Sequence, residues 1–105
     1  MDKAKRSRLE SGGWRAGSAA DLLELSPEEA AYVALKLALA NLLRDTRTRQ
    51  GWTQVQVARR LGSSQSRIAK MEAADATVSL DLLVKSLLAL GSTREEVGRV
   101  IGQAA

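Results

Sequence analysis

The stretch TQVQVARRLGSSQSRIAKME, residues 53–72, decides how the rest of the chain is organised. Thr53 offers a capping hydroxyl and Gln56 completes a capping box three residues later, so a short helix is expected to begin here. Gly62 ends that helix, because glycine adopts the left-handed backbone of a tight turn without strain. Two serines then offer a cap for a helix through residues 65–72. The sequence thus predicts two short helices joined by a three-residue turn.

Apolar spacing indicates which sides of these two helices face a core. The side chains expected to point inward are Val55, Ala58, Leu61, Ile68 and Met71. Trp52, just before the first cap, is expected to pack onto Val57 across it. We therefore interpret Trp52 as a core residue rather than as an exposed ring on which a ligand stacks.

A long helix is predicted upstream of this pair. Ser26, Pro27 and Glu29 supply a capping hydroxyl, a proline at the first helical position and a carboxylate three residues after the cap. The helix should run to about Gln50 and stop at Gly51. Two apolar stripes at helical spacing predict two neighbours for it. One stripe has Leu35, Leu39, Leu42 and Leu43, and the other has Val33, Leu37 and Ala40.

Two more helices are predicted downstream. Ser79 caps a segment over residues 80–90 that Gly91 closes, and a second capping box from Thr93 to Glu96 begins a last helix. The inward-facing residues are expected to be Leu80, Leu83, Val84, Leu87, Leu88, Val97, Val100 and Ile101. No segment has the alternation of a strand, so the fold class is all-α, with five helices.

The amino-terminal residues differ from the rest of the chain. Residues 1–20 contain three glycines, three serines and five basic side chains, with almost no periodic apolar content. We expect a disordered basic tail there, which is more consistent with a solubilising role than with an arm that contacts an anionic partner. Residues 21–105 are then one domain.

Composition excludes several kinds of chemistry. The 105 residues contain no Cys and no His, so thiolate nucleophiles, Cys/His zinc sites and imidazole acid/base catalysis are all ruled out. We expect no enzyme activity, no metal and no cofactor. The chain begins with charges rather than an apolar core, and its apolar stretches are too short for a membrane span. This pattern predicts a soluble cytoplasmic protein with no membrane partner.

Basic side chains gather in the middle of the chain. The whole chain has 16 Lys and Arg against 12 Asp and Glu, a net charge of +4. Residues 44–70 hold seven basic side chains and one acidic side chain. A basic segment between near-neutral or acidic ends is typical of a surface that faces phosphates, although charge alone fits a solvated helical face equally well.

The residues of the quoted stretch resemble those of a known family, the Xre or Cro-like group of phage-repressor helix-turn-helix proteins. The positions that carry the resemblance are Thr53, Gln54, Ala58, Leu61, Gly62, Ser64, Ile68 and Glu72. It covers about residues 39–90. It implies a repressor that binds double-stranded DNA, with the first short helix across the DNA backbone and the second in the major groove.

The resemblance also implies roles for individual residues. The predicted base contacts are Gln65, Ser66, Arg67 and Lys70, at the exposed start of the second short helix. Glutamine pairs with adenine through two hydrogen bonds, and arginine or lysine pairs with guanine. The resemblance implies a phosphate contact for Gln54. We also predict phosphate contacts for Thr53, Ser64, Arg47 and Arg60, although the two arginines fit a solvated helical face equally well.

Two expectations concern protein partners. Residues 80–90 are apolar over a wider arc than one small domain covers, which predicts a homodimer. The alternative is a monomer in which the first and last helices cover that arc. The long leading helix and basic tail are similar to HigA-type antitoxins, which bind a ribonuclease-type toxin and repress their own operon. Single-domain regulators without a toxin remain open, as does a protein-interaction module that does not bind specific DNA.

Overall fold

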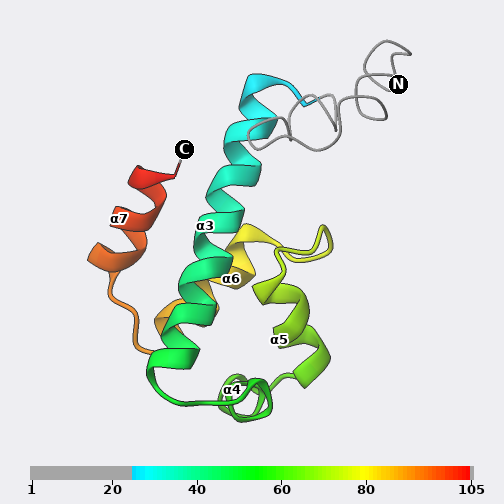
Figure 1. The fold of residues 1–105 in the computed structure, drawn as a ribbon, viewed down its shortest axis with the longest axis vertical. Coiled ribbons are helices and arrows are strands. Elements are labelled where there is room, and N and C mark those ends of the chain that lie inside the picture. The colour runs from blue at the N-terminus through cyan, green and yellow to red at the C-terminus, as the bar shows by residue number, and fades with distance from the viewer. Residues whose placement is uncertain (1–24, 105) are drawn as a thin grey trace. The chain divides into compact units, whose positions relative to one another are not determined.

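The computed structural model describes residues 25–104, and this part of the chain forms five α-helices and no strand (Figure 1). The helices are α3 (Pro27–Arg49), α4 (Gln54–Leu61), α5 (Gln65–Glu72), α6 (Leu80–Ala89) and α7 (Arg94–Gln103). The predicted all-α fold is confirmed. The predicted tail and the predicted domain boundary at residue 21 lie outside the described residues. By its internal contacts the chain divides into two units, residues 1–33 and residues 34–105, so the boundary falls within α3. The core and the candidate site described below belong to the second unit.

Each helix begins at a capping residue that the sequence predicts. The Thr53 hydroxyl accepts the N–H of Gln56 at 3.1 Å, and the Gln56 side chain accepts the N–H of Thr53 at 2.7 Å. Ser26 and Glu29 form the same reciprocal pair at the start of α3. The caps of the other three helices are Ser64, Ser79 and Thr93. Each such cap stabilises its helix by about 1 kcal/mol.

The turn between α4 and α5 depends on Gly62. Its φ of 63° and ψ of 40° lie in the left-handed region, which costs a residue with a Cβ about 1 to 2 kcal/mol. The turn is closed by a hydrogen bond of 2.8 Å from the N–H of Ser63 to the carbonyl of Ala58. Gly62 therefore fixes the direction in which α5 leaves α4.

One apolar core joins all five helices. The most deeply buried side chains are Leu39, Leu43, Val57, Ile68, Met71, Leu83 and Leu87. Val97 brings α7 onto the same cluster, and Trp52 packs against it from the residue before the α4 cap. The predicted inward positions Ala58, Ile68 and Met71 are confirmed.

Three apolar positions differ from the prediction. Val55 is 45 % exposed, because it lies two residues from buried Val57 and therefore about 200° around the axis of α4. Leu37 is 48 % exposed, so the second apolar stripe of α3 is only partly covered by other described residues. Leu88 is 43 % exposed although it was expected to face inward.

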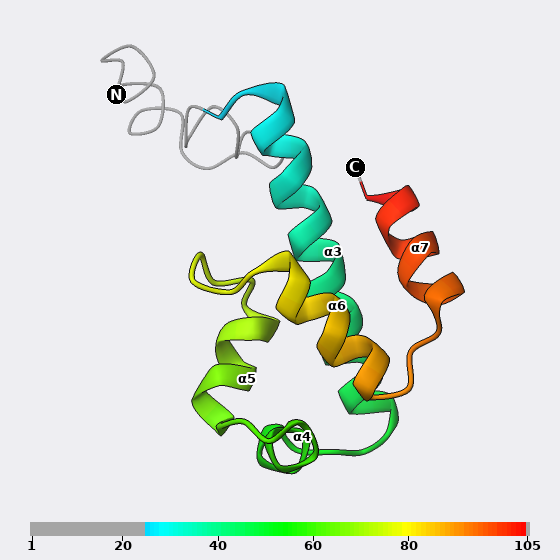
Figure 2. The ribbon, with the colours of Figure 1, turned by 180° about the vertical axis from the view of Figure 1, so that it is seen from behind.

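The arrangement places α5 and α7 on opposite sides of α3. Both Figure 1 and Figure 2 show α4 beyond the carboxyl end of α3, α5 on one flank and α7 on the other. None of the described helices combines the length and the apolar character that crossing a membrane requires. The α5 flank carries the residues of the candidate site.

Candidate nucleic-acid interface

The helix α5 has one buried side and one exposed side. Ile68 and Met71 lie in the core, with 0 % and 1 % of their surface exposed. The four predicted base contacts all lie on the exposed part of the helix: Gln65, Ser66, Arg67 and Lys70. The structure therefore brings these four side chains together on one anchored helix and leaves them open to solvent.

The predicted phosphate contacts Thr53 and Ser64 are both helix caps. The Ser64 hydroxyl accepts the N–H of Arg67 at 3.2 Å and lies 3.3 Å from the Ser66 hydroxyl. Both capping side chains are exposed. Because a hydroxyl that accepts one hydrogen bond still has a donor, each cap can donate to an anion in addition.

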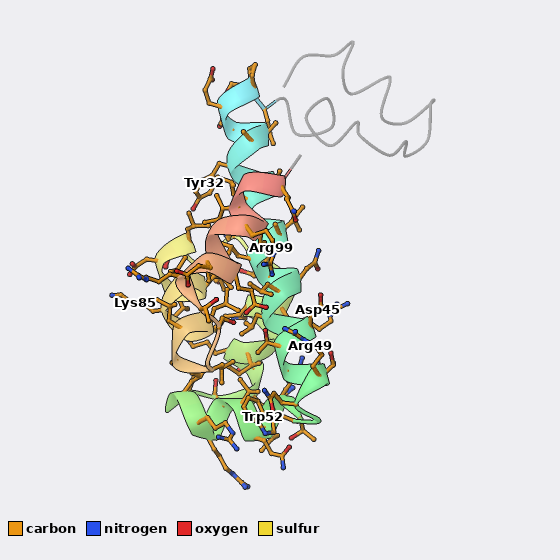
Figure 3. The ribbon with its side chains drawn as sticks, turned by 90° about the vertical axis from the view of Figure 1, so that its left-hand side faces the viewer. Tyr32, Asp45, Arg49, Trp52, Lys85 and Arg99 are labelled. Atoms are coloured by element: carbon orange, nitrogen blue, oxygen red, sulfur yellow. The ribbon has the colours of Figure 1, made fainter. Side chains whose placement is uncertain are left out.

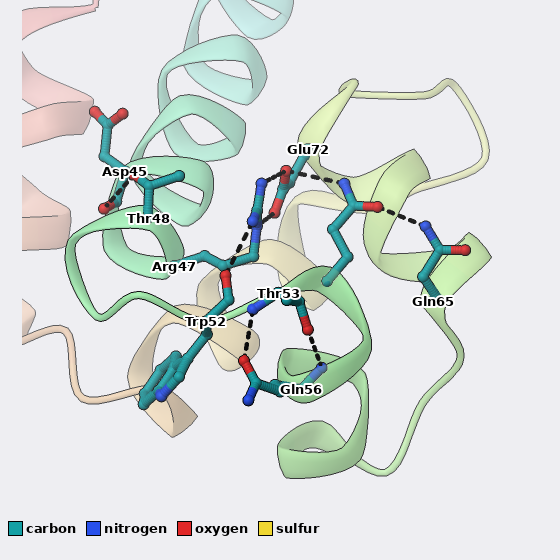
Figure 4. Close-up of polar contacts among 9 residues, drawn as sticks. Asp45, Arg47, Thr48, Trp52, Thr53, Gln56, Gln65 and Glu72 are labelled. Atoms are coloured by element: carbon teal, nitrogen blue, oxygen red, sulfur yellow. Dashed lines mark hydrogen bonds and ion pairs between the residues drawn. The ribbon is translucent and has the colours of Figure 1, made fainter.

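A chain of side-chain hydrogen bonds crosses from α3 to the start of α5 (Figure 4). Arg47 donates through Nε and Nη2 to the two carboxylate oxygens of Glu72. Gln54 Nε2 donates to Glu72 Oε1 at 3.2 Å. Gln65 Nε2 in turn donates to Gln54 Oε1 at 2.6 Å. We call these four residues the Glu72 relay.

Within the relay, Arg47 and Glu72 are largely withdrawn from solvent. Their side chains are 17 % and 5 % exposed, and Arg47 also donates through Nη1 to the carbonyl of Trp52 at 3.1 Å. The hydrogen bond to Glu72 raises the pKa of the Arg47 guanidinium above its ordinary value. Arg47 thus holds the end of α3 against α4 and α5, and this geometry speaks against the phosphate contact predicted for it.

Arg60 is exposed, and its guanidinium lies over the ring of Trp52, 4.0 Å from the ring centroid. Such a cation–π contact stabilises by about 0.5 to 1 kcal/mol at an exposed site. The ring is half-buried against the core, as expected for Trp52, and it fixes the direction of Arg60. The Arg60 head therefore sits at the surface near the α4 end of the domain.

An open pocket of about 250 Å³ adjoins α5. Its lining residues are Ser64, Ser66, Arg67, Lys70, Thr77 and Val78. Four of these were predicted to contact DNA, and Thr77 in the loop after α5 was not. The loop is shaped by Asp75, whose carboxylate accepts the N–H of Thr77 at 2.9 Å and its hydroxyl at 2.6 Å. These hydrogen bonds lower the pKa of Asp75.

Lys36 is a second residue whose role the sequence did not indicate. It is only 8 % exposed, and its Nζ donates to the carbonyl of Asp75 at 2.8 Å. The contact ties the loop after α5 to α3, 39 residues away in the chain. No local pattern predicts such a contact, because the partner is a backbone carbonyl in an irregular loop.

The described residues hold no cluster of acidic side chains that could bind a metal ion. Comparison with known proteins gives a family but no individual relative. A model of the helix-turn-helix family HTH_3 matches residues 43–97, just over half of the chain. No curated protein and no solved structure matches.

The matched segment runs from the end of α3 through the first turn of α7 and includes the whole α4–α5 pair. It begins and ends a few residues later than the predicted resemblance over about residues 39–90. The chain belongs to the helix-turn-helix family HTH_3 and is a DNA-binding transcription regulator of the Xre type.

Proposed function

We propose that this regulator recognises a specific duplex sequence by placing α5 in the major groove, and that it does so as a homodimeric repressor. The observation that carries the proposal is the division of α5 into a buried side and an exposed polar side. A rigid helix with four exposed polar or basic side chains matches the way such helices present base-reading groups.

The chemistry of these side chains suits base edges. Arg67 presents two guanidinium donors, which match the N7 and O6 acceptors of guanine. Gln65 presents a donor and an acceptor, which match N7 and N6 of adenine. Lys70 and Ser66 can donate to an acceptor atom of guanine or of adenine. Each matched pair contributes about 1 to 3 kcal/mol of discrimination against a wrong base.

Phosphate contacts would set the register of α5 in the groove. The helix ends capped by Thr53 and Ser64 carry partial positive charge and unpaired amides, which favours a phosphate at each. Gln54 has one N–H left after its bond to Glu72, and Arg60 is exposed nearby. We propose these four as phosphate contacts and assign Arg47 to the ion pair with Glu72.

The geometry of DNA supports the homodimer, whereas the apolar face of α6 does not, because little of that face is exposed. Most of the apolar arc of α6 is covered within the chain, since Leu83 and Leu87 are fully buried and Leu80, Leu82 and Val84 are partly buried against the core. One recognition helix nevertheless buries little surface on DNA, whereas a two-fold pair reads two half-sites about one helical turn apart. Sedimentation equilibrium with and without duplex tests this part, and a monomer that binds a single half-site with full affinity would contradict it.

The antitoxin role remains a prediction from the sequence resemblance. Co-expression with a small neighbouring reading frame tests it: growth inhibition by that frame should be relieved by this chain. Relief by an α5 variant that no longer binds DNA would instead favour the protein-interaction module as the main function.

The test of DNA binding is a mobility shift on the DNA upstream of the chain's own reading frame, repeated over a range of salt concentrations. The logarithm of the binding constant should fall linearly with the logarithm of the salt concentration, with a slope of about −0.9 for each phosphate neutralised. Scrambled duplex of the same length is the control. A flat salt response, or equal affinity for the scrambled duplex, would contradict the proposal.

A further inference from the structure

We propose that Glu72 sets which base Gln65 prefers, although Glu72 itself does not reach the DNA. It acts through Gln54, by fixing which way the two amide groups of the Glu72 relay point. The inference rests on the proposed function, because it takes Gln65 to be a base-reading residue. Glu72 is then a positioning residue, and its effect is on specificity.

The chemistry of the relay determines the orientation of both amides. The oxygen and nitrogen of a glutamine amide have nearly the same shape, so only hydrogen bonds distinguish them. The Glu72 carboxylate, held by both Nε and Nη2 of Arg47, can only accept. The Gln54 atom that faces it must therefore be the nitrogen, and the Gln54 oxygen must point away.

The orientation of the Gln54 amide in turn fixes the orientation of the Gln65 amide on α5. Gln54 Oε1 can only accept, so the Gln65 atom 2.6 Å from it must be the donor Nε2. Gln65 is left with its Oε1 and the second N–H of its Nε2. The N–H lies on the side of Gln54 and the oxygen on the far side. An exposed edge in this fixed order matches adenine, which needs one donor and one acceptor.

Without the Glu72 carboxylate, nothing fixes which of the two Gln65 amide atoms, the nitrogen or the oxygen, lies next to Gln54. If Gln54 turned its nitrogen toward Gln65, the Gln65 oxygen would take the near position and its NH₂ the far one. That reversed edge would no longer match the same base pair in the same register. A variant that frees Gln54 should thus bind DNA with weaker preference at the base pair read by Gln65.

The experiment measures a ratio of affinities. Selection from a random duplex pool with the unmodified chain and with Gln65→Ala identifies the base pair whose preference depends on Gln65. The ratio of Kd values between duplexes that differ only at this base pair is then measured for each variant. Gln65→Ala should lower the ratio by about fivefold or more, since a bidentate pair discriminates by at least that factor.

Glu72→Gln is the direct test. The substitution keeps the shape of the side chain, but the Gln54 atom that faces it no longer has to be a hydrogen-bond donor. It also removes the partner of a buried guanidinium, so Gln54→Met serves as a second variant that leaves the Arg47–Glu72 ion pair in place. We expect both variants to lower the ratio by about threefold or more. In the Gln65→Ala background, Gln54→Met should change the ratio no further.

The two roles of Gln54 separate in this measurement. Loss of a phosphate contact weakens binding to both duplexes equally, because phosphate contacts carry no base information. If Gln54→Met weakens both equally and leaves the ratio unchanged, or if folded Glu72→Gln keeps the full ratio, the relay is overturned while the proposed function stands. If Gln65→Ala itself leaves every preference unchanged, base reading by Gln65 fails, and the role of Glu72 fails with it.

Discussion

The two flanks of α3 are held by different chemistry. On the α5 flank, the ion pair of Arg47 with Glu72 and the hydrogen bond of Lys36 to the Asp75 carbonyl join segments 25 and 39 residues apart, and both are largely buried. On the α7 flank, the ion pair of Arg49 with Glu96 is long, at 3.6 Å, and its arginine side chain is 62 % exposed. There the burial of apolar side chains such as Val97 is the main contact.

The difference fits the role that we propose for α5. Covering a core with α7 requires apolar area, and area burial tolerates small changes in angle. In the proposed function, aiming Gln65 and Arg67 into a groove requires α5 to keep a fixed direction, and hydrogen bonds with defined geometry supply this. We therefore expect substitutions on the α5 flank to have larger effects than the same substitutions on the α7 flank.

The largest expected effect on stability is that of Glu72→Gln. It leaves the Arg47 guanidinium in a largely buried site without its carboxylate, and breaking a buried ion pair in this way costs roughly 3 kcal/mol at the lower end of the usual range. We take the lower end because Arg47 keeps some contact with water. Urea unfolding followed by circular dichroism measures the change, and a loss close to zero would show that the relay does not hold the α5 flank.

A matched pair of core substitutions compares α4, the helix that the Gly62 turn joins to α5, with α7. Val57→Ala in α4 should lower the free energy of unfolding by about 2 kcal/mol, from two buried methyl groups and the cavity they leave. Val97→Ala in α7 should cost less, about 1 kcal/mol, because this side chain keeps some exposure and its helix can shift to fill the space. Equal losses in thermal unfolding would mean that α7 is as tightly packed as α4.

Gly62→Ala tests the turn that directs α5. The left-handed backbone of Gly62 strains any side chain, so stability should fall by about 1 kcal/mol. No atom lies within 4 Å of the position that a Cβ would take, so the effect comes from backbone conformation rather than from a clash. An unchanged melting temperature would contradict this reading of the turn, and Gly98→Ala within α7 is the matched control, for which no strain is expected.

The smallest effect is expected for Glu96→Gln. This is the same substitution as at Glu72, made on the α7 flank. An exposed ion pair contributes about 0 to 1 kcal/mol, and salt screens it further. We expect a value near the lower end here, because the pair is long and its arginine is exposed. A loss as large as that of Glu72→Gln would remove the contrast between the two flanks.

The helices of this fold were predictable from the sequence because their signals are local. A cap such as Thr53 and its partner Gln56 lie within one turn, and the left-handed turn residue Gly62 is identified by its lack of a Cβ. The exposed positions of α5 follow from the same helical periodicity that buries Ile68. The family resemblance then supplied the expected base contacts on α5 and the expected phosphate contact of Gln54.

The Glu72 relay and the hydrogen bond of Lys36 to the Asp75 carbonyl could not be predicted in this way. Glu72 was recognised only as a matching family position, and its partners Arg47 and Gln54 are 25 and 18 residues away. Arg47 looked like a phosphate contact because a basic residue at the end of a helix near the basic segment gives the same sequence signal whether it is buried or exposed. The predicted capping box at Thr93 is half formed for a related reason, since the Glu96 carboxylate pairs with Arg49 of α3 instead.

The most direct test of the central claim compares two exposed arginines, one on each flank. Arg67 lies on α5. Arg99 lies on α7, where Figure 3 labels it. Each is replaced by alanine, so the net charge changes equally. Competition binding should show that Arg67→Ala weakens binding to the selected duplex by about tenfold or more and reduces preference at one base pair. Arg99→Ala should leave that preference intact. Equal small losses for both variants, with sequence preference unchanged, would contradict recognition of DNA by α5.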